Sequence, residues 1–171
     1  MRNNNHKAIT LIELIMVIGM MGILVTAVTF VYQLHFKVWN EGYTRSVIRG
    51  RLSQALEIAS GRLLQAQTID AITESSVTFT ADLGSGSSTY RLYLYNADDP
   101  EPNPPYTQST YDLRFAQDAV DYGDGAVWSS DIVQPSSPAF ALDGKVLTIN
   151  LTTSRGAQQV TMRTKIRPRN L

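Results

Sequence analysis

The chain has 171 residues, with 15 Lys plus Arg against 15 Asp plus Glu and a hydrophobic content of 43%. This length accommodates one domain with an appendage. The zero net charge argues against a general nucleic-acid binder, which is usually basic. The sequence contains no Cys, which excludes a disulfide framework, a thiolate metal site and a Cys nucleophile.

The first predicted element is an apolar stretch of 24 residues from Ile9 to Tyr32, in which Glu13 is the only charged residue. About 20 apolar residues at 1.5 Å each span the hydrocarbon core of a bilayer, which is about 30 Å thick. Arg2 and Lys7 precede the stretch and favour a cytoplasmic N-terminus. We therefore expect a single transmembrane helix here, with the rest of the chain outside the inner membrane.

A secretory signal peptide is the alternative interpretation of this stretch. The apolar region of such a peptide runs over about 7–15 residues and ends at a small-residue cleavage site. Val25-Thr26-Ala27 resembles a site of this kind. The apolar run is longer than that range and contains a carboxylate, so a membrane anchor is favoured over cleavage after Ala27.

Glu13 is unusual because it is the only charged residue of the apolar stretch. It lies four residues after Ile9, which is about 6 Å along a helix. A charged side chain deep in a bilayer costs about 2.5–3.5 kcal/mol, although one this close to the end can reach the interface. One interpretation is a tolerated interfacial carboxylate. The other is that a cation, in this chain or in another one, offsets the cost.

The residues around Glu13 carry a family resemblance. Lys7-Ala8-Ile9-Thr10-Leu11-Ile12-Glu13-Leu14, followed by an apolar run, resembles the prepilin signal of type IV pilins and type II secretion pseudopilins. In that family a prepilin peptidase removes a short basic leader, and the new terminal residue is N-methylated. The resemblance implies a leader over residues 1–8, cleavage between Ala8 and Ile9, methylation of Ile9, and a role for Glu13 in assembly.

Two positions depart from the family pattern. Ala8 stands where the family usually has Gly, and Ile9 stands where it usually has Phe or Met. Both replacements are small or apolar, so we expect cleavage. The new α-amine has a reference pKa of about 7.7–8.0, and methylation keeps its positive charge. Glu13 of one subunit facing the amine of a neighbour would act as a register check, because an unpaired charge in low dielectric is costly.

Beyond the apolar stretch, apolar residues recur three and four positions apart, which is the period of a helix. They are Ile48, Leu52, Ala55, Leu56, Ala59, Leu63, Ala66 and Ile69. We predict one helix from about Thr10 to about Ile72, with a transmembrane part over residues 9–32 and an amphipathic part over residues 33–72 that packs against a sheet. Gly19 and Gly22 either permit close helix packing in the membrane or are simply tolerated there.

Residues 73–171 are predicted to be a β-sheet head that forms one globular domain with the amphipathic helix. Alternating apolar and polar residues indicate strands, and they predict two hairpins, one over residues 77–83 and 90–95 and one over residues 146–151 and 159–166. Residues 111–116 are a candidate for a further short strand. Residues 98–105 are rich in proline, which excludes regular structure, and residues 117–145 look irregular. We expect four strands in a mostly antiparallel sheet on the helix, an α+β fold, and the resemblance implies the same pilin-like architecture.

Residues that carry chemistry are few. His6 lies in the leader and His35 lies beside the membrane, so neither a Ser-His-Asp triad nor a His metal site is available in the head. We expect no enzymatic activity and no cofactor. Asp118, Asp121 and Asp124 are weak candidates for a structural calcium, which takes six to eight oxygen ligands. The alternatives are a solvated acidic surface and, least favoured, a glycosidase carboxylate pair.

Charges and tyrosines are unevenly distributed along the head. Residues 63–145 hold three basic residues against twelve acidic ones, whereas residues 146–171 hold five basic residues and no acid. The basic end, Arg163–Arg169, either faces an acidic neighbour, lipid headgroups or DNA, or is a solvated edge. Six tyrosines between positions 90 and 122 indicate either ordinary sheet packing or an interface.

These observations lead us to expect a structural subunit of a type IV pilus or a type II secretion pseudopilus, without a nucleic-acid partner. Residues 75–80 and Val160–Leu171 resemble the J-type pseudopilin and W-type minor pilin group, which implies a minor subunit at or near the filament tip. The implied partners are a prepilin peptidase, other pilins or pseudopilins, and the assembly platform of the bacterial inner membrane. The competing hypotheses are a tip module for adhesion or DNA uptake, and a membrane-anchored enzyme.

Overall fold

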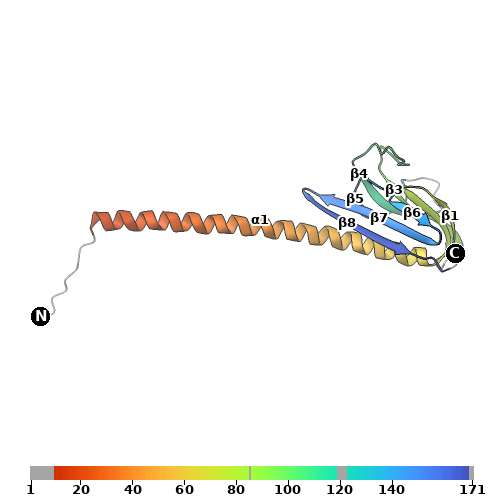
Figure 1. Ribbon diagram of the computed structural model, residues 1–171, viewed down its shortest axis with the longest axis horizontal. Coiled ribbons are helices and arrows are strands. Elements are labelled where there is room, and N and C mark those ends of the chain that lie inside the picture. The colour runs from red at the N-terminus through yellow and green to blue at the C-terminus, as the bar shows by residue number, and fades with distance from the viewer. Residues whose placement is uncertain (1–9, 85, 119–122, 170–171) are drawn as a thin grey trace. The chain divides into compact units, whose positions relative to one another are not determined.

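The computed structural model describes residues 10–84, 86–118 and 123–169, and this part of the chain contains one helix followed by eight strands (Figure 1). The elements are α1 (Leu11–Leu64), β1 (Ala66–Ile72), β2 (Ser76–Asp82), β3 (Ser87–Tyr95), β4 (Thr110–Gln117), β5 (Ala126–Val133), β6 (Phe140–Asp143), β7 (Val146–Arg155) and β8 (Gln158–Ile166). The chain divides into two compact units between Tyr43 and Thr44, within α1. A long helix with an antiparallel sheet confirms the predicted α+β class.

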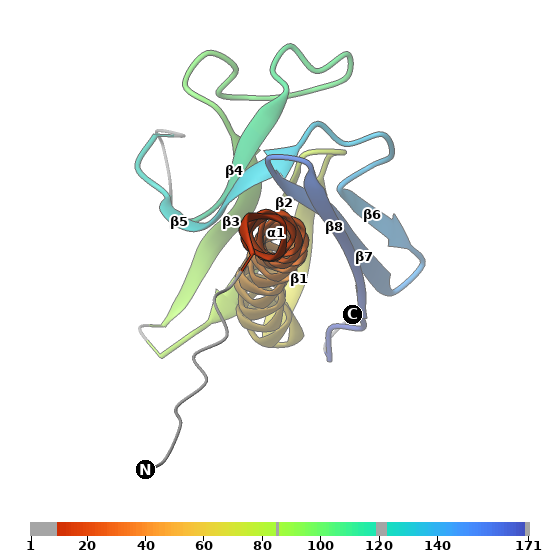
Figure 2. The same cartoon turned by 90° about the vertical axis from the view of Figure 1, so that its left-hand side faces the viewer.

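The described strands form one antiparallel sheet in the order β1-β2-β3-β4-β5-β7-β6. Both β5 and β6 pair with one edge of β7, and β8 pairs with the other edge. The two ends of the sheet approach one another, because the Glu74 carbonyl accepts hydrogen bonds from the amides of Ala139 (2.9 Å) and Phe140 (3.2 Å). Figure 2 shows the resulting curl, with the strands arranged around the last turns of α1.

The predicted helix end at Ile72 is wrong, because α1 ends at Leu64 and residues 66–72 form β1. The Gln65 amide donates to the Arg62 carbonyl at 3.1 Å, a bond from residue i to i−3 that tightens the last turn of a helix. The segment that follows contains the β-branched residues Thr68, Ile69 and Ile72, which favour extended backbone. Pairing with β2 then satisfies the backbone of this segment.

The predicted count of four strands is also wrong, because the described residues form eight. Residues 117–145 contain two unpredicted strands, β5 and β6, β1 is a third, and the candidate stretch 111–116 forms β4. The other four strands lie where alternation predicts them. The hairpins β2–β3 and β7–β8 and the strand β4 are therefore confirmed. The proline-rich segment between β3 and β4 contains no helix and no strand, apart from an isolated bridge between Asn96 and Asp99.

The predicted apolar stripe of the helix packs against the sheet. Leu52, Ala55, Leu56, Ala59 and Leu63 are each at most 5% exposed. They form one cluster with inward-facing strand residues, among them Val77, Phe79, Leu92, Leu113 and Ile149. Burial of this apolar surface is the main favourable contribution to the stability of the head. The interpretation of the stripe as the contact with a sheet is confirmed.

Candidate functional site

The N-terminal part of α1 exposes an unusual amount of apolar surface. Every large apolar side chain from Leu11 to Tyr43 is between 52% and 78% exposed. The helix is long and apolar enough to cross a membrane. Thr26 and Thr29 donate their hydroxyls to the carbonyls of Gly22 and Val25, both at 2.8 Å. These bonds lie within the helix, so the two hydroxyls need no water, and the surface suits an apolar surrounding.

Glu13 folds back over the first turn of α1. Its Oε2 accepts hydrogen bonds from the amide and the hydroxyl of Thr10, both at 2.9 Å. In return, the Glu13 amide donates to Thr10 Oγ1 at 3.4 Å. This reciprocal pattern is a capping box, which satisfies amides that a helix start otherwise leaves without partners. Within the described residues, Glu13 Oε1 accepts no hydrogen bond, so one carboxylate oxygen is available to a partner.

Two further predictions concern this part of the chain, the cleavage site and the two glycines of the membrane helix. Ala8 and Ile9, the predicted cleavage site, lie outside the described residues. Gly19 and Gly22 have open space where a Cβ would stand, with nothing within 4 Å. They leave two shallow places on the helix surface that another helix can approach closely.

Aromatic side chains form a stripe at the end of the apolar surface. Tyr32, Phe36, Trp39 and Tyr43 are spaced four, three and four residues apart and are 64–73% exposed. This spacing places them on one face of the helix. Tyr and Trp are enriched where a membrane helix meets the headgroup layer. The sequence reasoning did not single out these residues, although their spacing was readable in the sequence.

The calcium candidates do not form a metal centre in the described part of the chain. Asp118 Oδ1 accepts from the Thr89 amide at 3.1 Å, and the Asp118 amide donates to the Thr89 carbonyl at 2.8 Å. Asp118 therefore closes the ladder between β3 and β4. Asp124 is exposed, and Asp121 lies outside the described residues. Among described residues, no group of three or more His, Cys, Asp or Glu is placed to hold a metal ion.

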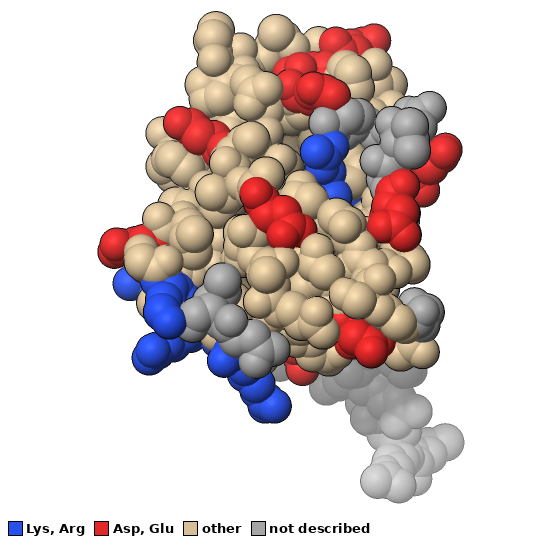
Figure 3. All heavy atoms as spheres, turned by 90° about the vertical axis from the view of Figure 1, so that its right-hand side faces the viewer, with Lys and Arg blue, Asp and Glu red and all other residues tan. Residues whose placement is uncertain are grey.

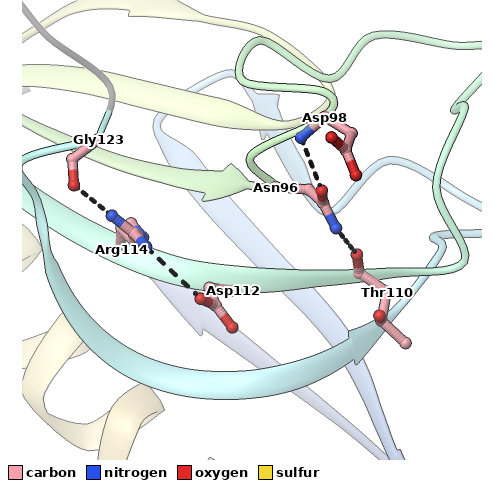
Figure 4. Close-up of polar contacts among 6 residues, drawn as sticks. All are labelled: Asn96, Asp98, Thr110, Asp112, Arg114 and Gly123. Atoms are coloured by element: carbon pink, nitrogen blue, oxygen red, sulfur yellow. Dashed lines mark hydrogen bonds and ion pairs between the residues drawn. The ribbon is translucent and has the colours of Figure 1, made fainter.

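A polar pocket of about 260 Å³ lies on β3, β4 and β5, and the sequence reasoning missed it. The cation of this pocket is Arg114, whose guanidinium lies over the Tyr95 ring at 4.1 Å from the ring centroid. It also donates a hydrogen bond to the Gly123 carbonyl and forms an ion pair with Asp112 at 3.7 Å (Figure 4). Beside it, Asn96 donates to the Thr110 carbonyl at 2.9 Å and accepts from the Asp98 amide at 3.0 Å. These contacts tie loops to strands.

Most tyrosines of the middle region pack within the head. Tyr90, Tyr93 and Tyr111 are at most 3% exposed, so sheet packing accounts for them. Burial outweighs the nearby positive charge of Arg114 and raises the pKa of Tyr93. Burial likewise raises the pKa of Tyr106 to about 12, and this ring contacts Tyr111 edge to face at 5.7 Å between centroids. These side chains are structural and do not form an exposed aromatic interface.

Comparisons of the chain with protein-family models, with curated proteins and with solved structures found no match. The resemblance of residues 7–14 to a prepilin signal therefore rests on those residues alone.

Two features of the described residues stand out as functional. One is the exposed apolar surface of α1, with the Glu13 carboxylate near its start. The other is the charged surface of the head. In the head, the described polar contacts hold loops and strands together, and none pairs a nucleophile with a base.

Proposed function

We propose that this chain is a structural subunit of a type IV pilus or a type II secretion pseudopilus. In this proposal a prepilin peptidase cuts between Ala8 and Ile9, and the subunit is anchored in the inner membrane and assembles through the N-terminal part of α1. The observation that carries the proposal is an exposed apolar helix surface, longer than the hydrocarbon core of a bilayer, with the Glu13 carboxylate close to its start.

The length of this surface supports assembly as well as anchoring. Leu11 to Tyr43 is 33 residues, or about 50 Å of helix at 1.5 Å per residue. The hydrocarbon core takes about 30 Å, and the headgroup layers bring the total to about 40–45 Å. An average tilt of about 20° shortens the projected length by only about 3 Å. In this proposal, neighbouring helices of the same kind cover the apolar side chains that lie beyond the hydrocarbon core.

The surroundings of Glu13 support a role in assembly. The capping box engages Oε2 and leaves Oε1 without a described partner. Removal of residues 1–8 would create a positively charged amine on Ile9, two residues before α1. The amine of a neighbouring subunit then offsets the cost of placing the Glu13 carboxylate in an apolar surrounding. A subunit in the wrong register would leave both charges unpaired, so the pair selects the correct stagger.

The head supports a structural role in a different way. Its apolar residues form one buried cluster around the last turns of α1, and its described acidic and tyrosine side chains mainly hold loops in place. The sequence contains no His after position 35 and no Cys at all. We therefore propose a subunit without enzymatic activity and without a cofactor.

The test uses Glu13→Gln in the full chain, expressed in a host that assembles the filament. Gln preserves the capping box and removes only the charge. Membrane insertion should be unchanged, and the content of the variant in isolated filaments should fall at least tenfold, since breaking a buried ion pair costs about 3–5 kcal/mol.

Glu41→Gln is the matched control, because Glu41 is an exposed carboxylate farther along the same part of α1. This variant should enter filaments as the wild type does. Equal filament content of wild type, Glu13→Gln and Glu41→Gln would reject the assembly role of Glu13.

A further inference from the structure

A groove of about 330 Å³ lies between α1 and β8 in the head. It is lined by Arg45, Arg49, Gln159, Val160, Thr161, Met162 and Arg163. The strand β8 pairs only with β7 among the described strands, so the groove follows a free edge of the sheet. Met162 packs against the core cluster, which gives the groove an apolar floor, while Arg45, Arg49 and Arg163 are exposed at its rim.

No carboxylate among the described residues of the head neutralises the three arginines of this groove. The only ion pair between described residues joins Arg114 to Asp112, so no described carboxylate lies within 4 Å of the groove arginines. Like charges that line one concave surface repel each other and raise the local positive potential. An anionic group that enters the groove relieves this repulsion, and guanidinium groups bind carboxylates with well-defined geometry.

The head also presents the complementary charge on a defined loop. The loop between β3 and β4, residues 96–109, contains Asp98, Asp99 and Glu101 and no basic residue. Asp99 Oδ2 accepts hydrogen bonds from the Tyr111 hydroxyl at 2.8 Å and the Thr107 hydroxyl at 2.9 Å. Asp99 thus fastens the loop to β4, while Asp98 and Glu101 remain exposed.

The acidic loop and the basic groove lie on different parts of the head. In Figure 2 the loop projects at the top, whereas β8 runs beside the helix. On the face of the head shown in Figure 3, acidic side chains are spread over most of the surface and basic ones gather mainly at the lower left. A head therefore offers both an anionic and a cationic surface to its surroundings.

We propose that the acidic β3–β4 loop of a second copy of this chain docks in the basic groove, with Asp98 and Glu101 facing Arg45, Arg49 and Arg163. The contact is heterologous, since two different surfaces meet, and such contacts repeat along an open helical assembly. The proposal rests on the proposed function only in that assembled helices bring the heads together. Anchoring in one membrane raises the effective concentration, so a weak contact suffices.

The charge balance of the chain favours a second copy as the occupant. Its basic and acidic residues are equal in number, so two copies carry no net repulsion and attract each other through opposite patches. Nucleic acid or an anionic lipid would bind the groove as well, but it would leave the acidic loop without a counterpart.

The test uses cysteine cross-linking, because the chain has no native Cys. Two full-length copies with different tags are expressed in one host, one carrying Gln159→Cys in the groove and the other Asn103→Cys in the loop. A third variant, Ser87→Cys, replaces the loop cysteine as a control, since Ser87 lies at the opposite end of β3. Val17→Cys in both copies reports separately whether the helices assemble.

The expected result is a cross-linked pair of differently tagged copies for positions 159 and 103 but not for positions 159 and 87. Arg49→Glu in the first copy should lower the yield at least fivefold, and Glu101→Arg in the second copy should restore most of it. Raising the ionic strength from about 0.05 M to about 0.5 M should lower the yield as well, since salt screens exposed charges.

Other outcomes overturn the proposal in distinguishable ways. Cross-linking at position 17 without specific cross-linking between 159 and 103 rejects the docking contact and leaves the proposed function intact. Absence of both cross-links rejects the proposed function and the docking contact together. A pair at 159 and 103 that ignores charge reversal rejects the electrostatic contact described here.

Discussion

The two parts of α1 contain similar apolar residues but differ in what covers them. Leu24, in the N-terminal part, is 64% exposed, whereas Leu52, in the head, is fully buried under the sheet. Up to Tyr32 the apolar residues surround the helix, whereas the buried residues from Ile48 to Leu63 follow a single stripe. A helix that is apolar on all sides requires an apolar surrounding on all sides, and a striped helix requires only one covering face. The chain supplies the cover of the striped part itself, and the described residues leave the N-terminal part uncovered.

The largest expected effect tests this difference directly. Leu52→Ala should lower the free energy of unfolding of the head by about 2–5 kcal/mol, because it leaves a cavity in the packed core. Leu24→Ala, the matched control, should leave that quantity unchanged. Urea unfolding of the full chain in detergent, followed by the near-UV circular dichroism of the aromatic core, measures both. Equal losses for the two variants would mean that Leu24 is also covered within a single subunit.

A second pair of substitutions compares glycines of the two parts. A Cβ on Gly125 would clash with the Tyr93 hydroxyl and lie 3.2 Å from the Phe115 carbonyl oxygen. Gly125→Ala should therefore cost about 1–3 kcal/mol of head stability, as overpacking does.

Gly22→Ala is the control for this pair, because no atom lies within 4 Å of its Cβ position. Head stability should not change, and any effect should fall on filament content, where close helix packing matters. A loss of head stability in Gly22→Ala would contradict the separation of the two parts.

The smallest expected effect is a pH dependence of the stability of the head, which Asp99 causes. Partial burial acts to raise the pKa of Asp99, but hydrogen bonds from Tyr111 and Thr107 outweigh it, so the pKa lies below its usual value of 3.8. The stabilisation is thus present above that value and is lost as the pH falls through the lower pKa of the folded state. Between about pH 4 and pH 2, the wild type should lose more head stability than Asp99→Asn. Asp98→Asn, an exposed neighbour, should follow the wild type, and a parallel decline in all three would contradict the prediction.

Much of the fold was readable from the sequence because local patterns and the final structure agree. The strands β2, β3, β4, β7 and β8 show the alternation that a half-buried strand requires. The boundary between α1 and β1 was not readable, because Leu63, Ala66 and Ile69 continue the helical spacing. Tertiary pairing with β2 decided that segment, and propensity alone did not.

The strands β5 and β6 were missed for a different reason. β5 pairs with β4 through register shifts, and its Asp131 has a φ of 59°, so its side chains do not alternate regularly. β6 has only four residues, which is too short for a pattern. Both depend on long-range pairing with other strands, which no local window contains.

One candidate site could be predicted from the sequence and the other could not. The position of Glu13 was readable, and so was its cap, because Thr10 followed three residues later by Glu13 is the sequence signature of a capping box; the reasoning overlooked it. The basic groove was not readable, because Arg49 and Arg163 lie far apart in the sequence and meet only through the placement of β8 beside α1.

The most direct test of the account is the mass of the mature N-terminus, measured on the chain from cells with and without the prepilin peptidase. The proposed function predicts a chain that begins with N-methylated Ile9, found only where the peptidase is present. An intact Met1 in both strains would contradict it and leave a plain signal-anchored protein. A chain that begins at Val28 would contradict it as well, because the apolar helix would then be a removed signal peptide.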